Sequence, residues 1–407
     1  MIKTIVLLSA LASSLGFAAN SDDWPNVAKD CGEVFQPPAP PPPPPNFVKR
    51  FIACGADFFT ARPVHPTVKS IVPGSGFGVG PTFTELFNAG KWQRDFTATG
   101  VASTRAFWQT EAKFTASHDK FGENNSARDR FAYDFYARAR DLPLMPYYGI
   151  GPNTSRSDLV DFRQRDVAAG GEVFNPFSAW FALGGRFETL WADVGGVTDP
   201  GRISITSTSN EGTVPGLTSQ PNLLHSEIYA EPRRTRGKFQ FDYKIGYNFY
   251  ADHDTGRYSF QRFQIDGTHV FHPTGRNENI LTVRDRLSLS NTNGASVVPF
   301  YLQETLGGSD INGDAALRGF ADYRFRGPDL MLIQVEYDQR IWGPVGLLGF
   351  YDTGEVALKA SDLSLAEMRH SFGFGFSFWA GNRAVFKAYI GLGSGEGRHS
   401  YVGIPSF

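Results

Sequence analysis

The chain has 407 residues and carries 39 Lys and Arg against 41 Asp and Glu, a formal net charge of −2. Its 44 glycines and 14% aromatic residues favour an all-β protein. The near-neutral charge argues against a nucleic-acid partner, which needs a basic face. Two cysteines in so long a chain exclude a disulfide scaffold and a multi-cysteine zinc module.

Residues 1–19 have the composition of a secretory signal peptide. Lys3 precedes an uncharged apolar run from Ile5 to Leu15, and small residues follow at 16, 18 and 19. No later apolar stretch reaches the roughly 18 residues that a spanning helix needs. Export without a helical anchor leaves three fates for the chain: secretion, a periplasmic location, or insertion as a β-barrel.

The next segment, residues 20–73, is predicted to be a periplasmic Pro-rich segment ahead of the barrel. Eight of the nine residues in 37–45 are proline, which predicts a stiff polyproline II spacer. Docking of a periplasmic partner on this run is the alternative. Cys31 and Cys54 flank it, and they are either a disulfide, which an oxidising compartment favours, or two free thiols.

From residue 74 to 407 apolar and polar residues alternate with a period of two, the pattern of β-strands with one polar face. In residues 238–250 the odd positions are Phe, Tyr or Ile, and the even ones are polar, charged or Gly. We predict fifteen strands: 75–87, 92–105, 107–118, 129–140, 158–170, 179–193, 223–231, 238–250, 257–271, 278–291, 328–341, 345–356, 369–379, 384–392 and 397–407.

A soluble β-sandwich also alternates, but its strands are usually five or six residues long. The segments here run about 11 to 14 residues, enough for a tilted span of the membrane. Their polar face carries Arg, Lys, Asp and Glu, which a dry core does not tolerate and a wet barrel lumen does. We therefore predict a transmembrane antiparallel β-barrel in the outer membrane, in contact with its lipid.

A bacterial barrel with both termini in the periplasm needs an even number of strands. We therefore expect a sixteenth strand near the N-terminal end. The long polar connections 194–222 and 291–327 fall on the same side of the sheet. Since outer-membrane barrels have short periplasmic turns and long outer loops, this side is predicted to be extracellular.

The connection 299–327 reads PFYLQETLGGSDINGDAALRGFADYRFRG. It resembles the inward-folded sixth extracellular loop of the BamA/TamA-like barrels (bacterial surface antigen domain). The matching elements are Pro299 to Tyr301, Gly307 with Gly308, and the tip Leu317, Arg318, Gly319 and Phe320. Downstream, Phe350, Asp352 and Gly354 match the family's F-x-D-x-G strand motif, and Glu336 stands where the family has a second acidic residue.

The resemblance covers roughly 280–407 closely, and 76–80 and 147–151 more loosely. It implies a sixteen-stranded barrel that acts on unfolded outer-membrane or secreted protein clients, by insertion or translocation. There are two departures. Residues 20–73 are too few and too Pro-rich for even one of the family's periplasmic POTRA domains, and Gly403 and Pro405 stand where the C-terminal signal usually has bulky apolar residues.

The tip motif also has a physical reading of its own. Arg318 offers a fixed, always charged fork that suits two carboxylates, and the strand parity points Glu336 and Asp352 into the lumen. Gly319 permits a tight turn close to the wall. Strand 371–378 directs four Phe outward and only Ser and Gly inward, which leaves room for a loop. We therefore predict that Arg318 pairs with Asp352 and Glu336 and anchors the loop inside the barrel.

No catalytic, metal or cofactor site is predicted. Gly391 to Gly395 has the spacing of a nucleophile elbow but lies in a hairpin, and His269 with His272 is the only close histidine pair. Two functions remain open: a protein insertase or translocase, or a structural or pore-forming barrel without client-folding activity.

Overall fold

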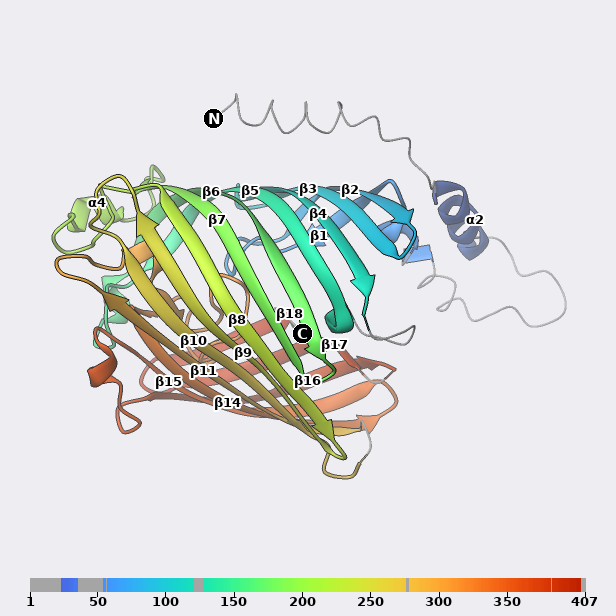
Figure 1. Cartoon of the computed structure of the whole chain (residues 1–407). Helices are drawn as coiled ribbons and strands as arrows, with labels where there is room; N and C mark the ends of the chain where they lie inside the picture. The colour runs from blue at the N-terminus through green and yellow to red at the C-terminus, as the bar shows by residue number, and fades with distance from the viewer. Residues whose placement is uncertain are drawn as a thin grey trace, which may run out of the picture.

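The computed structural model describes residues 23–35, 54–55, 57–120, 127–275, 278–381 and 383–403 (Figure 1). The predicted signal peptide 1–19 and the proline run 37–45 lie outside these residues. In the described ranges, no helix is both long and apolar enough to cross a membrane.

One antiparallel sheet of sixteen strands makes up most of the chain, and each strand pairs with its neighbour in sequence among the sheet strands. The sheet curls around a lumen (Figure 1). Its strands are β1 (Val64–Lys69), β2 (Gly78–Ala89), β3 (Trp92–Ser103), β4 (Trp108–Asp119), β5 (Arg130–Tyr147), β6 (Val160–Ser178), β7 (Phe181–Gly196), β8 (Leu223–Arg236), β9 (Phe239–Asp252), β10 (Phe260–Phe271), β11 (Asn279–Thr292), β14 (Asp329–Trp342), β15 (Val345–Ala357), β16 (Arg369–Ala380), β17 (Arg383–Gly393) and β18 (Gly397–Gly403).

The predicted all-β, sixteen-stranded architecture is confirmed, and each of the fifteen predicted strands overlaps an observed one. The sixteenth is β1, which pairs with β2 and lies ten residues before the predicted start of the barrel at 74. It escaped prediction because it has only six residues, one of them Pro66, and no aromatic side chain. Strands β1 and β18 are the two edges of the sheet, and the structure shows no pairing between them in the described ranges.

The two faces of the sheet follow the alternation in the sequence. The four Phe of β16 point outward, and Phe374 is 65% exposed. The opposite face carries charged pairs between neighbouring strands, such as Arg140 with Asp166 at 2.9 Å and Arg186 with Glu172 at 2.8 Å. An apolar outer surface around a charged interior is the arrangement of a membrane barrel and the reverse of a soluble sandwich.

The two long connections lie at one end of the barrel. Helix α4 (Ile205–Thr208) is in the connection between β7 and β8, and the connection between β11 and β14 contains a small second sheet of β12 (Glu304–Leu306) and β13 (Phe325–Gly327). An apolar cluster packs at this end, around the fully buried Phe300. The single turns of 3₁₀ helix are η1 (Ala127–Asp129), η2 (Arg156–Asp158), η3 (Phe300–Leu302) and η4 (Ala360–Asp362).

A short helical segment precedes β1. Helix α2 (Trp24–Phe35) carries Cys31, which forms a disulfide with Cys54. Asp23 and Arg62 form an ion pair at 2.8 Å. The disulfide resolves the alternative that the sequence left open for the two cysteines.

Candidate functional site: an arginine held against the lumen wall

The loop between β11 and β14 turns back on itself inside the barrel. Strand β12 pairs with β13, and two glycines with positive φ, Gly307 and Gly308, follow β12. The amide of Gly307 donates to the carbonyl of Ala316 at 2.8 Å, and that of Gly308 donates to Leu317 at 3.1 Å. A Cβ on Gly307 would stand 2.3 Å from the carbonyl oxygen of Ala321, so only glycine fits this fold of the loop.

Arg318 lies at the tip of this loop, 5% exposed, and contacts two strands of the wall. Its backbone amide donates to Asp352 Oδ2 at 2.9 Å, its Nε to the same oxygen at 3.0 Å, and its Nη2 to Asp352 Oδ1 at 2.7 Å. Its Nη1 donates to Glu336. The structure thus brings together the three charged residues that the sequence analysis selected, on the loop, on β15 and on β14.

Two aromatic rings flank the guanidinium. The carbon Cζ of Arg318 lies 3.8 Å from the ring centroid of Phe350 and 5.7 Å from that of Tyr389, and the two rings meet edge to face. Lys387 of β17 donates to the second oxygen of Glu336 at 2.6 Å. The charges are therefore paired and partly shielded from water, the condition under which a buried guanidinium is stable.

Burial alone lowers the pKa of Arg318, but Asp352, and to a lesser extent Glu336, outweigh that effect and raise it. Arg318 therefore stays charged at neutral pH.

The tip backbone lies against β17. A Cβ on Gly319 would stand 2.5 Å from the amide nitrogen of Gly393, and one on Gly391 would stand 2.7 Å from the carbonyl oxygen of Arg318. The expectation that the glycines of β16 make room for the loop differs from the structure. A Cβ on Gly373 would stand 2.3 Å from the carbonyl oxygen of Ile390 and 2.4 Å from the ring of Phe350. One on Gly375 would stand 2.0 Å from the carbonyl oxygen of Ala388 and 2.7 Å from Tyr389, so these glycines accommodate the backbone of β17 and the two residues whose rings lie beside Arg318.

The remaining predicted residues, Leu317, Phe320 and Gly354, lie where the loop packs on itself and on the wall. Leu317 and Phe320 are buried in an apolar cluster with Leu306 of β12 and Phe325 of β13. Leu317 has a φ of 54°, which side chains rarely adopt and which is maintained only by strong surrounding contacts. A Cβ on Gly354 would lie 2.9 Å from the carbonyl oxygen of Met331 on β14 and 3.3 Å from Leu306 Cδ1, so this glycine allows a close approach of β14 and of Leu306.

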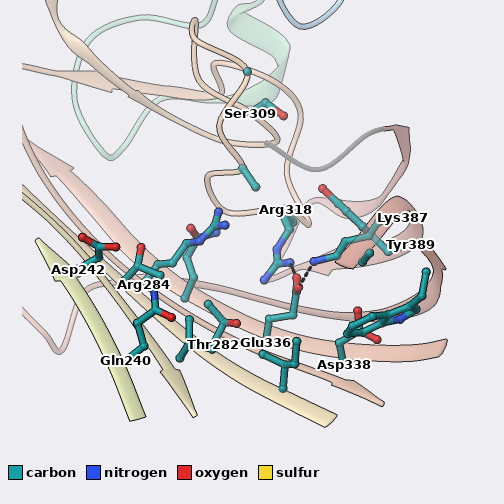
Figure 2. Close-up of a pocket in the computed structure, with 18 of the residues that line it drawn as sticks. Gln240, Asp242, Thr282, Arg284, Ser309, Arg318, Glu336, Asp338, Lys387 and Tyr389 are labelled. Carbon is teal, nitrogen blue, oxygen red and sulfur yellow. Dashed lines mark hydrogen bonds and ion pairs between the residues drawn. The ribbon is translucent and has the colours of Figure 1, made fainter. Parts of the chain in front are cut away.

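A cavity of about 400 Å³ lies beside Arg318 (Figure 2). Loop residues Ser309, Gly313, Ala315 and Arg318 line one side, and the wall lines the rest. The wall contributes apolar and aromatic side chains together with polar ones of both signs, and they come mostly from near the short-turn ends of the strands. The polar ones include Gln240, Asp242, Thr282, Arg284, Glu336, Asp338 and Lys387.

Several residues of this site were not predicted. Lys387 and Tyr389 face the lumen by the parity of their strand, but nothing in their local sequence links them to a loop 70 positions earlier. Arg286 of β11 is a third case, since it donates to Asp310 of the loop at 2.7 Å. In the described residues, no group of three or more His, Cys, Asp or Glu is placed to hold a metal ion.

No protein-family model matches the chain, and no curated protein matches it. Solved structures do. BamA from Haemophilus ducreyi lacking POTRA domains 1–3 aligns over 93% of this chain and 80% of its own, with a TM-score of 0.52 and 10% identity. CdiB from Escherichia coli aligns over 84% of this chain, with a TM-score of 0.53 and 12% identity. CdiB from Acinetobacter baumannii aligns over 81%, with a TM-score of 0.48 and 11% identity.

The chain spans 60% and 55% of the two CdiB chains, so it covers less than two thirds of either. At such low identity the likeness is one of fold. The fold of the chain is that of a BamA-like barrel, and the resemblance noted in the sequence is confirmed at that level.

Proposed function

We propose that the chain is an outer-membrane β-barrel that inserts proteins into that membrane or translocates them across it. Its outer apolar face contacts lipid, both termini face the periplasm, and its partners are unfolded outer-membrane or secreted proteins. The shared fold with BamA and CdiB supports this class of function over a catalytic one. A periplasmic partner at the Pro-rich segment belongs to the same proposal.

One observation carries the proposal: a loop folded into the lumen and fastened there by Arg318 through Asp352 and Glu336. A barrel that serves only as a scaffold has no need for a buried arginine on the connection between two strands, since taking these charges out of water costs free energy that the pairing must offset. We assign to Arg318 the role of loop anchor. Leu317, Gly319 and Phe320 fit the tip to the wall, and Phe350 and Gly354 shape the receiving surface.

The experiment is the folding rate of a denatured small outer-membrane barrel into liposomes that contain this protein, compared with empty liposomes. We expect faster folding with the wild-type protein and loss of the acceleration with Arg318→Ala. The matched control is Arg284→Ala. Arg284 lines the same cavity, and in the part of the chain that the structure describes it forms no ion pair or hydrogen bond.

Acceleration by the wild-type protein and by Arg284→Ala, but not by Arg318→Ala, supports the insertase proposal. The alternative function is a structural or pore-forming barrel, which the cavity in the lumen, with charged side chains of both signs in its lining, favours. Bilayer conductance without any acceleration of client folding would replace the proposal with that alternative.

A further inference from the structure

The extracellular ends of the two edge strands are close to the same two loop residues. The connection 70–77 follows β1, and the turn 394–396 precedes β18. Since β1 and β18 share no pairing in the described residues, no backbone ladder there holds these ends together. In the described residues, side chains of the loop between β11 and β14 contact both ends of this seam.

Arg324 contacts the β18 side of the seam. It is 2% exposed, and its Nε and Nη2 donate to both carboxylate oxygens of Glu396, at 2.8 and 2.6 Å. Its other donors reach Thr154 of the β5–β6 connection: Nη1 to Oγ1 at 2.8 Å and Nη2 to the carbonyl at 2.6 Å. From the same connection, Arg156 donates to the carbonyl of Glu396 at 2.9 Å.

Tyr323, the preceding residue, contacts the β1 side. Its ring is 1% exposed and belongs to the apolar cluster that includes Val72, and its hydroxyl donates to the carbonyl of Pro73 at 3.4 Å. Tyr323 has a φ of 58°, a conformation that costs free energy in a non-glycine residue and persists only where the surroundings enforce it. Adjacent residues of one loop therefore reach opposite edges of the sheet.

We propose that Tyr323 and Arg324 form a latch that holds the extracellular ends of β1 and β18 together, and that its release lets the seam open. The latch rests on the proposed function, which gives the seam a reason to open. Arg324 and Tyr323 are positioning residues. Glu396 is the weak point, because it lies on a three-residue turn and a buried arginine without its carboxylate is poorly tolerated.

The test is a distance measurement by pulsed electron spin resonance on the full chain in phosphatidylethanolamine and phosphatidylglycerol vesicles. Spin labels replace Val68 on β1 and Ser400 on β18, both exposed in the structure. The wild-type protein is expected to give one narrow distance. In Arg324→Met and in Glu396→Gln a second, longer distance should gain about tenfold in population, equivalent to about 1.4 kcal/mol. In Arg324→Lys the population of the longer distance should lie between those of the wild-type protein and Arg324→Met, since an ammonium group cannot bind both carboxylate oxygens and Thr154.

The matched control is Arg140→Met. Arg140 also forms a two-point pair with a carboxylate, that of Asp166, on strands far from the seam in sheet order. This variant should leave the narrow distance unchanged.

If Arg324→Met does not fold, Glu396→Gln alone is used for the test. A distance distribution that is the same in wild type, Arg324→Met and Glu396→Gln overturns the latch, whatever the client assay gives. A lengthened distance in vesicles that never accelerate client folding keeps the latch and overturns the proposed function.

Discussion

The start and the tip of the connection between β11 and β14 are held in place by different kinds of interaction. Its start packs Phe300 among apolar and aromatic side chains at the mouth of the barrel, with ring centroids 5.1 Å from Phe162 and 5.6 Å from Tyr147. Its tip places Arg318 among charges deep in the lumen. Apolar packing is not directional, whereas charge-assisted hydrogen bonds fix position and angle. We therefore expect the mouth to contribute most to stability, and the tip to fix a geometry that can be lost without unfolding the barrel.

The largest effect on stability is expected at the mouth. Phe300→Ala removes a ring that is fully buried, and such substitutions cost about 3 to 5 kcal/mol because a cavity remains. Urea unfolding in lipid vesicles measures the loss. Phe300→Leu is the control and should lose clearly less. Equal stability of Phe300→Ala and wild type would show that the apolar cluster does not support the barrel.

At the tip, Arg318→Ala leaves Asp352 and Glu336 without their partner. Breaking a buried pair costs about 3 to 5 kcal/mol, and water in the lumen reduces this figure. Because Lys387 still pairs with Glu336, we expect the barrel to keep its heat-modifiable gel mobility while the loop becomes sensitive to protease. Loop cleavage at the wild-type rate would contradict the anchor role.

A smaller effect is expected from Gly319→Ala, which keeps every charge. The added methyl group would stand 2.5 Å from the backbone of Gly393 and of Leu392, so the tip must move away from β17. Protease sensitivity of the loop should lie between those of wild type and Arg318→Ala. Gly349→Ala, whose methyl group would meet its nearest neighbour at 3.9 Å, should behave as wild type. If both glycine variants behave alike, the tip does not touch β17.

The smallest effect is a pH dependence at the mouth. Burial raises the pKa of Glu211, but hydrogen bonds from Gly216, Tyr258 and Thr218 together bring it below its ordinary value. A carboxylate with a lowered pKa stabilises the fold above its unfolded pKa, and this contribution is lost as the pH falls through the lower, folded value. Acidification below about pH 4 should therefore loosen the connection 194–222.

Proteolysis of that connection as a function of pH measures the effect. Glu211→Gln should be more sensitive at neutral pH and should show a flatter pH profile than the wild-type protein. Identical pH profiles in the two proteins would show that the Glu211 carboxylate does not stabilise this connection.

Features that depend on strand periodicity or on a local motif could be predicted from the sequence. Long alternating strands define their own faces, so fifteen of the sixteen strands and the inward direction of Glu336 and Asp352 could be read in advance. Strand β1 could not, because six residues with a proline carry too little pattern. The pairing of Arg324 with Glu396 joins residues 72 positions apart on two irregular segments, and neither segment has a period that predicts a partner.

The error about the glycines of β16 has a physical reason of a similar kind. An inward glycine predicts empty space on the wall, but it does not say what fills the space. The backbone of β17, with Phe350 and Tyr389 on the two neighbouring strands, is nearer than the loop and occupies it. The loop tip then lies on Gly391 and Gly393 of β17.

The measurement that tests the central claim most directly is the position of the loop tip in a lipid bilayer. Spin labels at Asn312, exposed on the loop, and at Gln240, on the opposite wall of the cavity, report the distance between loop and barrel. We expect one narrow distance in the wild-type protein and in Arg284→Ala, and a broad distribution in Arg318→Ala. A narrow distance that survives Arg318→Ala would contradict the claim that this arginine holds the loop in the lumen.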